Sequence, residues 1–365
     1  MAWLAVLPAG ILAVVLTVYA YQTVSATTTT PRLVVASVPF WNLSQGTGSV
    51  LAHRQDVNEV SPWMYGLSPD SAIVLDSGVS QPEINRYLSE VRGKGLPVVP
   101  TLANIDGRGN WTYAPVARML HDPALMARQV TAITTVVEDH GYAGIDIDYE
   151  ELHAGDRQAF STFVTHLAAA LHARHKILSV ALFAKATDAG YAPRNIAQDY
   201  AAVGKAADQV RLMGYDYHWA TSPPGPVAPV TWLRAVLRYA KTLMPAKKII
   251  LGIPMYGYDW SGGHGAALTW AQAMRLTEQY HVKTSYDPTS QAPWFRYTDP
   301  AGHQHTVWFE NAASAKAKFT VAKQARIGGV YLWMYGDGDP AMWSGLSQIL
   351  PIGARLAVPA PQEMP

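Results

Sequence analysis

Eight short apolar runs recur along the chain, and segments with helix-like spacing, such as 122–141 and 156–175, lie between them. The runs are nearly continuous in Val, Ile and Leu, which is typical of strands covered on both faces. Strands that alternate with helices predict parallel βα units. Eight such units match a (β/α)8 TIM barrel, an α/β fold. The predicted strands cover residues 33–41, 57–66, 95–104, 143–150, 177–185, 209–217, 248–260 and 328–336.

The longest interval between predicted strands separates the seventh strand from the eighth. It mixes one helix with short strands and hairpin signals such as DPAG at 299–302. This pattern predicts a small α+β insertion over about 260–310, within a barrel domain that covers 33–352. Residues 27–32 include the run TTTT, which indicates a short linker. The Pro-rich residues 353–365 are expected to form a disordered tail.

The N-terminal residues 2–21 carry no charged side chain and are almost entirely apolar. A stretch of about 20 apolar residues can span a bilayer as a helix. Val24 and Ala26 then stand where a signal peptidase prefers small residues. We therefore expect residues 1–26 to be a signal peptide or an N-terminal membrane anchor, and a buried core helix is the alternative. The protein would be secreted or extracytoplasmic, with residues 2–21 as its membrane anchor if the segment is retained.

The composition excludes several classes of function. The formal net charge is only +1, so no global field draws the chain to nucleic acid or to an anionic membrane. Cysteine is absent, which rules out a disulfide framework, a zinc–thiolate site and a thiol nucleophile. The 12 Trp and 19 Tyr residues supply flat rings that pack in a core and also make stacking platforms for sugars and bases.

The segment GIDIDYE at 144–150 places three acidic residues two positions apart, where side chains of a strand share one face. The acids are Asp146, Asp148 and Glu150, and the other face holds Ile145, Ile147 and Tyr149. The second set can pack under the helices, so the acids are predicted to point into the barrel. Glu150 comes last, at the carboxyl end of the strand, where barrel enzymes keep their active sites.

Three inward carboxyl groups on one strand need an explanation other than packing. Burying an ionised carboxylate is costly unless it is paired or protonated, and crowding of like charges raises the pKa of one of the groups. We therefore interpret the three acids as catalytic. A structural polar network and a divalent metal site are the alternatives. Against a metal, inward residues on one strand spread over about 13 Å, too far for all three to bind one ion.

Several motifs resemble those of glycoside hydrolase family 18, the chitinase-like barrels. Residues 143–150 resemble the D-x-x-D-x-D-x-E signature of this family. LMGYDYHW at 212–219 resembles the M-x-Y-D motif of its sixth strand, and GGVYLW at 328–333 resembles its eighth-strand segment, which ends in Trp. Segments 251–260 and 286–314 are most similar to a bacterial branch that includes spore-cortex-lytic N-acetylglucosaminidases.

The resemblance covers about 33–350, and the motifs fall in the right order on the predicted strands. One departure is visible, because Ala143 replaces the first Asp of the signature. That residue is outermost from the reaction, so we expect tuning of activity and not its loss. Tyr149 stands where Trp is common, and it is expected to face away from the site.

The resemblance implies a mechanism in which the N-acetyl group of the substrate is the nucleophile. Glu150 would protonate the glycosidic oxygen as general acid and then act as base on water. Asp148 would bind the acetamido N–H and stabilise the oxazolinium-like intermediate, and Asp146 would share a proton with it. Tyr215 would hold the acetamido carbonyl oxygen for attack. No metal or organic cofactor is implied.

The resemblance also implies a set of substrate-binding residues. Asp216 would bind sugar hydroxyls or support Glu150, and Trp333 would form the apolar floor beneath the cleaved sugar. Three aromatic residues near the ends of other strands either line subsites or merely pack. The substrate-binding candidates are Asp216, Trp333, Met213, Tyr65, Trp41 and Tyr256.

These patterns lead us to expect an exported hydrolase that cleaves β-1,4 bonds of N-acetylglucosamine-containing polysaccharide, either peptidoglycan or chitin. The polysaccharide is the expected partner, nucleic acid is not, and the chain is expected to be a monomer. The alternatives are a chitinase proper and a non-catalytic, lectin-like barrel that binds chitin or other sugars. Lectins of this family typically lose the acid at the position of Glu150, which is present here.

Overall fold

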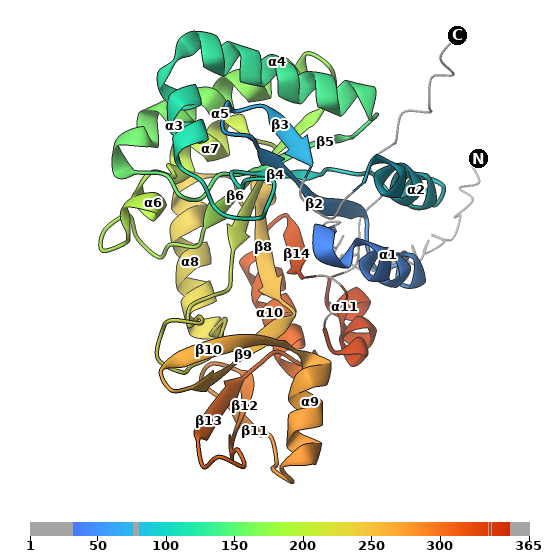
Figure 1. Cartoon of the computed structure of the whole chain (residues 1–365), viewed down its shortest axis with the longest axis vertical. Helices are drawn as coiled ribbons and strands as arrows, with labels where there is room; N and C mark the ends of the chain where they lie inside the picture. Colours follow the sequence, from blue (N-terminus) through green and yellow to red (C-terminus); the bar gives the residue numbers. More distant parts are fainter. Residues whose placement is uncertain (1–31, 76–79, 335, 337, 351–365) are drawn as a thin grey trace, which may run out of the picture. The chain divides into compact units, whose positions relative to one another are not determined.

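The computed structural model describes residues 32–75, 80–334, 336 and 338–350. Figure 1 shows these residues coloured from blue to red along the sequence. The predicted N-terminal segment 1–26 and the predicted tail 353–365 lie outside them. Within the described ranges, no helix is both long enough and apolar enough to cross a membrane.

In the described part of the chain, eight parallel strands pair in a closed ring (Figure 1). Their order is β1-β14-β8-β7-β6-β5-β4-β2, and the pairing of β1 with β2 closes the ring. The TIM barrel predicted from the sequence is therefore confirmed. The strands are β1 (Leu33–Pro39), β2 (Glu59–Leu67), β4 (Thr101–Ala103), β5 (Gly144–Asp148), β6 (Ile177–Phe183), β7 (Gln209–Met213), β8 (Ile249–Pro254) and β14 (Gly329–Trp333).

Each predicted run contains one barrel strand, but two runs differ from the expectation. In the third run only Thr101–Ala103 forms a strand. The seventh run, 248–260, divides into β8 and the strand β9 (Tyr256–Ser261), which pairs with a different sheet. Burial differs between the two strands: every residue of β8 is buried, as in a strand covered on both faces, whereas Tyr258 and Asp259 of β9 are partly exposed.

Helices surround the ring, and their sequence signals are local. The carboxylate of Asp122 accepts the backbone N–H groups of Ala124 (2.8 Å) and Leu125 (3.0 Å), so it caps α4, which begins at Pro123. The helices around the barrel are α1 (Leu43–Ala52), α2 (Gln81–Arg92), α3 (Ala114–His121), α4 (Pro123–Asp139), α5 (Arg157–His172), α6 (Pro193–Ile196), α7 (Tyr200–Ala206), α8 (Val230–Leu243), α10 (Ala312–Ala325) and α11 (Trp343–Ile349), with 3-10 helices at Phe40–Asn42, Ala154–Asp156, Ala246–Lys248 and Pro340–Met342.

The main core lies between the ring and these helices. Strand β5 is an example of how the outward-facing side chains of the strands contribute to this core. Ile145 and Ile147 point outward and are buried in this core. The ring of Tyr149 stacks on that of Phe163 in α5, with 5.7 Å between the centroids. Because side chains alternate along a strand, the residues between these three point to the inside of the barrel.

A second, antiparallel sheet interrupts the barrel between its seventh and eighth strands, as predicted (Figure 1). Its strand order is β10-β9-β13-β12-β11, and α9 (Trp270–Gln279) packs beside it. The sheet has a small core of its own, formed by Leu268, Ala273, Phe295, Tyr297, Val307 and Phe309. The remaining strands are β10 (His264–Thr269), β11 (Ser285–Asp287), β12 (Ala292–Thr298), β13 (Gln304–Trp308) and the short β3 (Ile73–Leu75), which pairs antiparallel with β2.

Candidate active site

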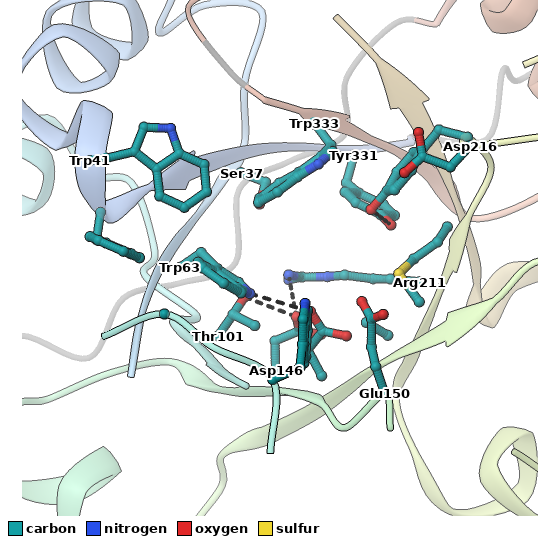
Figure 2. A pocket seen from close by; sticks show the side chains of 17 residues that line it. Ser37, Trp41, Trp63, Thr101, Asp146, Glu150, Arg211, Asp216, Tyr331 and Trp333 are labelled. Atoms are coloured by element: carbon teal, nitrogen blue, oxygen red, sulfur yellow. Dashed lines mark hydrogen bonds and ion pairs between the residues drawn. The ribbon is translucent and has the colours of Figure 1, made fainter. Parts of the chain in front are cut away.

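A cavity of about 360 Å3 opens at the carboxyl ends of the barrel strands. Side chains from β1, β2, β4, β5, β7 and β14, or from the loops that follow these strands, line it (Figure 2). Parallel strands bring residues that are far apart in the sequence to the same end of the barrel. Barrel enzymes keep their active sites at this end, so the cavity is the candidate active site.

The acids of β5 point into this cavity (Figure 2). The hydroxyl of Thr101 donates to Oδ2 of Asp146 (3.0 Å), and the indole N–H of Trp63 donates to Oδ2 of Asp148 (3.3 Å). Oδ1 of each aspartate is buried and has no hydrogen-bond partner among the described residues. Buried polar atoms are nearly always satisfied in a folded protein. These two oxygens are therefore positioned to bind a group that enters the cavity.

Arg211 lies at the bottom of the cavity and joins three strands. Nη2 donates to Oε1 of Glu59 on β2 (2.7 Å), and Nη1 lies 3.2 Å from Oδ2 of Asp146 on β5. Nη1 also donates to the hydroxyl of Ser61 (2.6 Å), and the amide of Gln209 donates to Oε2 of Glu59 (2.7 Å). One guanidinium thus faces two buried carboxyl groups. Burial raises the pKa of Glu59, and the charge of Arg211 opposes that rise.

Glu150 follows β5 where the strand ends. Its backbone N–H donates to the side-chain oxygen of Asn104 (2.8 Å), which fixes the chain at this point. Burial and the nearby charge of Asp148 raise the pKa of the Glu150 carboxyl well above its ordinary value, although Arg194 opposes the rise. Glu151 turns to Arg194 and forms an ion pair with it (2.7 Å). The environment of Glu150 therefore favours its protonated form.

Asp148 shares this electrostatic environment. Burial, followed by the charge of Asp146, raises the pKa of the Asp148 carboxyl to about 7. The hydrogen bond from Trp63 and the charge of Arg211 oppose the rise. Neighbouring buried carboxyl groups cannot all ionise, so one of them holds a proton near neutral pH.

The raised pKa of Asp148 predicts a pH-dependent contribution to stability. In the unfolded chain this carboxyl has its ordinary pKa of 3.8, against about 7 in the fold. Between these values the folded state holds the proton and the unfolded state does not, so stability falls as pH rises. This group alone should lower the free energy of unfolding by about 2 kcal/mol between pH 5 and pH 7. Urea denaturation of wild type and Asp148→Asn at both pH values measures the difference, and equal pH slopes in the two proteins would contradict it.

Two tyrosines and an aspartate also line the cavity. The hydroxyl groups of Tyr215 and Tyr331 are 2.7 Å apart, and burial raises the pKa of Tyr215 well above its ordinary value. Tyr215 therefore stays a neutral phenol that can donate a hydrogen bond. Asp216 has a φ of 55°, a left-handed conformation that Asp adopts more readily than most residues. Its Oδ1 accepts from Tyr256 (2.6 Å) and Tyr258 (3.1 Å) of β9.

Five aromatic residues, which we call the aromatic wall, form the apolar side of the cavity: Phe40, Trp41, Trp63, Trp111 and Trp333. The ring centroid of Trp63 lies 5.7 Å from that of Trp41, 6.0 Å from that of Trp333 and 6.1 Å from that of Trp111. Trp41 and Trp111 remain 55% and 38% exposed, so their rings are open to a ligand at the mouth. Such flat apolar surfaces next to acids suit the faces and hydroxyl groups of sugar rings.

Comparison with known proteins identifies this arrangement. Residues 35–338 match the family described as glycosyl hydrolases family 18. The chain belongs to glycosyl hydrolase family 18. The resemblance predicted from the sequence motifs is thus confirmed, and family 18 membership makes the chain a glycosidase.

Family 18 relatives cover most of the chain. The cortical fragment-lytic enzyme of Bacillus subtilis is 36% identical over 301 residues, which cover 80% of this chain and 70% of that protein. The spore cortex-lytic enzyme SleL of Bacillus cereus has a TM-score of 0.80 at 27% identity, covering 88% of this chain and 75% of the other. The chitinase of Chromobacterium violaceum ATCC 12472 has a TM-score of 0.82 at 31% identity, covering 88% and 99%.

Most residues that the sequence predicted for a family 18 site lie together around the cavity. Tyr256 lies behind the cavity surface, where it donates to Asp216. Tyr65 does not reach the cavity. The predicted residues that line it are Trp41, Asp146, Asp148, Glu150, Met213, Tyr215, Asp216 and Trp333.

Tyr65 faces the core because β2 contains an irregularity. Trp63 pairs with Thr101, which points inward, but the register shifts and Tyr65 pairs with Leu102, a core residue. A β-bulge adds one residue to one strand and so exchanges the faces beyond it. Tyr65 is consequently buried, with its hydroxyl 2.8 Å from that of Tyr142. The expectation that Tyr65 lines a subsite is wrong, and the alternative that it packs is correct.

Sequence reasoning missed nine residues of this family 18 cavity, among them Trp63, Trp111, Arg211 and Tyr331. Arg211 carried a signal, because it is a charged residue in the otherwise apolar run of β7. Arg211 stands two residues before Met213 on the same strand, so its side chain shares the face of Met213 and points into the barrel. The sequence around Trp111 contains no such signal, because this residue stands in the loop that follows β4.

The described residues offer no obvious metal centre. Among them, no group of three or more His, Cys, Asp or Glu side chains is placed to hold a metal ion. The acids of β5 are instead engaged by Thr101, Trp63 and Arg211. The chemistry that these residues themselves support is proton transfer and hydrogen bonding next to an apolar wall.

Proposed function

We propose that this glycosidase hydrolyses β-1,4 bonds of N-acetylglucosamine-containing polysaccharide by substrate-assisted, retaining catalysis. The observation that carries the proposal is the row of inward carboxyl groups that ends at Glu150, with Tyr215 in the lining of the same cavity. The spacing of the acids along β5 gives each one a different depth, and therefore a different partner on the substrate.

Glu150 is the general acid of the proposed reaction. It lies nearest the open end of the acid row, and its raised pKa keeps a proton available near neutral pH. That proton passes to the glycosidic oxygen as the bond to the sugar carbon breaks. The Glu150 carboxylate then takes a proton from the water that attacks the same carbon, which restores the acid.

Asp148, Asp146 and Tyr215 position the nucleophile, which is the acetamido oxygen of the substrate itself. Asp148 accepts the acetamido N–H through its unpartnered Oδ1 and stabilises the positive charge of the oxazolinium-like intermediate. Asp146 shares a proton with Asp148, and Tyr215 donates to the acetamido oxygen. Holding the nucleophile next to the reacting carbon replaces a bimolecular step by an intramolecular one.

The aromatic wall supplies the binding surface of the proposed reaction, with Trp333 beneath the cleaved sugar and Trp41 at the mouth. Replacing Trp41 by Ala is expected to raise KM for an oligosaccharide about 2- to 10-fold and to leave kcat nearly unchanged. A stacked ring contributes about 0.5–1.5 kcal/mol to ground state and transition state alike. Steady-state kinetics measure this, with Tyr286→Ala, an exposed ring in the second sheet, as control. An unchanged KM would remove Trp41 from the binding surface.

The polysaccharide that we favour is peptidoglycan. This preference is supported by the cortical fragment-lytic and spore cortex-lytic enzymes among the relatives, as their names describe them. Chitin is the second candidate, because a chitinase matches the fold at 31% identity over 88% of this chain. A non-catalytic, sugar-binding barrel is disfavoured by the presence of Glu150 with a raised pKa in the cavity.

Mass spectrometry of reaction products tests the proposal. The purified chain is offered peptidoglycan and chitin oligomers in parallel, with Glu150→Gln as the control. Muropeptides with N-acetylglucosamine at the new reducing end, absent with the variant, support a wall-cleaving glucosaminidase. Cleavage of chitin oligomers alone supports a chitinase. Binding of oligomers without any product would overturn the proposal in favour of the lectin-like barrel.

We also propose that the chain acts outside the cytoplasm. The apolar residues 2–21, followed by small residues before position 27, support export as a cleaved or a retained segment. Relatives named as cortex-lytic support action on wall material. Mass spectrometry of the N-terminus of the protein recovered from its native host distinguishes a chain that begins near position 27 from one that keeps the apolar segment.

A further inference from the structure

Seven cationic residues gather at the end of the barrel opposite the active site. Four of them stand in the segments that lead into strands β1, β8 and β14, and three stand in the last turns of helices α7, α8 and α10. We call this group the basic end. It consists of Arg32, Lys205, Lys241, Lys247, Lys248, Lys323 and Arg326.

Hydrogen bonds join the segments of the basic end into one surface. Nζ of Lys248 donates to the backbone oxygens of Gly204 (3.0 Å) and Lys205 (3.2 Å), which connects the 3-10 helix Ala246–Lys248 to the end of α7. Nζ of Lys241 donates to the backbone oxygen of Ala325 (3.0 Å), which connects the end of α8 to the end of α10.

The loops beside these helices are joined in the same way. The N–H of Gly328 donates to the oxygen of Ala246 (2.9 Å), and the N–H of Leu33 donates to the oxygen of Gly328 (2.9 Å). The guanidinium of Arg32 donates to the backbone oxygen of Ile327. The seven cations therefore belong to one continuous region and are not scattered over the molecule.

This region carries a charge excess that the whole chain lacks. The sequence has 28 Lys and Arg against 27 Asp and Glu. In the loops before β1, β7, β8 and β14 the one acidic residue is Asp208, and its carboxylate is engaged by the Leu178 N–H and by His172. Among the described residues, no ion pair involves any member of the basic end.

Helix stabilisation explains only part of this excess. A cation in the last turn of a helix interacts favourably with the helix dipole, which accounts for Lys205, Lys241 and Lys323. It does not account for Arg32, Lys247 and Lys248, which stand in the segments that lead into β1 and β8. Lys205, Lys241, Lys247, Lys323 and Arg326 are all exposed.

We propose that the basic end docks on a lipid bilayer that carries anionic headgroups. Such a surface attracts clustered Lys and Arg side chains that lie near the headgroups. The chain enters the barrel at Arg32, within the basic end, and the apolar residues 2–21 precede it. The ten uncharged residues 22–31 span at most about 35 Å. A retained apolar segment in a bilayer would thus keep the basic end within reach of that bilayer.

Docking at the basic end orients the enzyme. The basic end lies at the amino ends of the barrel strands, and the cavity with Glu150 lies at their carboxyl ends. The cavity would therefore open away from the bilayer. A polymer outside the membrane would reach the acids without crossing the anionic surface.

Energy transfer between the full chain and lipid headgroups tests this proposal. The sequence has no cysteine, so one introduced cysteine carries the donor label. One variant is Thr242→Cys at the basic end, and its counterpart is Thr221→Cys in the loop after β7, at the cavity end. Vesicles of phosphatidylcholine, with or without phosphatidylglycerol, carry the acceptor. We expect transfer from position 242 to rise when phosphatidylglycerol is added, to exceed transfer from position 221, and to fall in high salt.

Charge reversal distinguishes the attraction of the basic end to anionic headgroups from tethering by the apolar segment. The variant Lys205→Glu, Lys247→Glu, Lys323→Glu should lose the rise caused by phosphatidylglycerol. The matched control Arg128→Glu, Arg275→Glu, Lys283→Glu changes three exposed cations elsewhere on the molecule and should keep it.

Three results would overturn the proposal. One is a transfer that phosphatidylglycerol does not change, and another is an equal loss in the two triple variants. The third is tighter binding of the full chain to soluble poly(glycerol phosphate) than to vesicles at equal phosphate, which would assign the basic end to an anionic polymer. Cleavage of glycan oligomers by the Lys205→Glu, Lys247→Glu, Lys323→Glu variant reports on the proposed function separately, since none of the three residues lies near the cavity.

Discussion

Replacing Glu150 by Gln is expected to lower kcat by about 100- to 10,000-fold, the usual contribution of a positioned general acid. Gln keeps the size of the side chain and its hydrogen-bonding groups but cannot deliver a proton to the leaving oxygen. KM should change little, because the aromatic wall and Tyr215 remain in place. Steady-state kinetics on the oligomer that proves to be cleaved measure both constants.

The matched control for this experiment is Glu151→Gln. Glu151 is the next residue in the chain, but its carboxylate forms an ion pair with Arg194 and does not line the cavity. We expect kcat of this variant to stay close to that of the wild type. Equal losses in the two variants, or full activity of Glu150→Gln, would be incompatible with Glu150 as the acid.

Replacing Arg211 by Met is expected to lower the free energy of unfolding by about 3–5 kcal/mol. Arg211 is the cation that faces the buried carboxyl groups of Glu59 and Asp146, at 2.7 and 3.2 Å. Removing one partner of a buried ion pair leaves an uncompensated charge, and measured losses are of this size. Urea denaturation at neutral pH, followed by fluorescence of the many Trp residues, measures the change.

A double variant distinguishes lost charge pairing from lost packing. Arg211→Met combined with Glu59→Met removes the cation together with one of the carboxyl groups it balances. If unpaired charge causes the loss, the double variant should be more stable than Arg211→Met alone. A double variant that is even less stable would show that packing around the guanidinium dominates.

The barrel could be predicted from the sequence because its signals are local and repeated. All eight runs contain a barrel strand, since each carries the continuous apolar pattern of a strand buried on two faces. The insertion was also visible, as an interval too long for one helix. The junction at Met255 was not visible, because the run 248–260 stays apolar while the chain passes from the barrel to the second sheet.

The residues of the candidate site could be predicted wherever side chains alternate strictly between the two faces of a strand. Asp146, Asp148 and Glu150 follow it, and all three line the cavity. Tyr65 does not, because the irregularity in β2 reverses the faces at the end of that strand. No local sequence pattern predicts such a shift of register, because the shift arises from pairing with β4, a segment more than thirty residues away.

The junction at Met255 limits how these proteins can be recombined. β8 ends at Pro254 and β9 begins at Tyr256, while the N–H of Met255 donates to the backbone oxygen of Trp333 (2.6 Å). At this junction a single residue, Met255, separates the barrel wall from the second sheet. A chimaera that exchanges this sheet between barrels has to carry its first tyrosines along, since the hydroxyl groups that hold Asp216 belong to the part being exchanged.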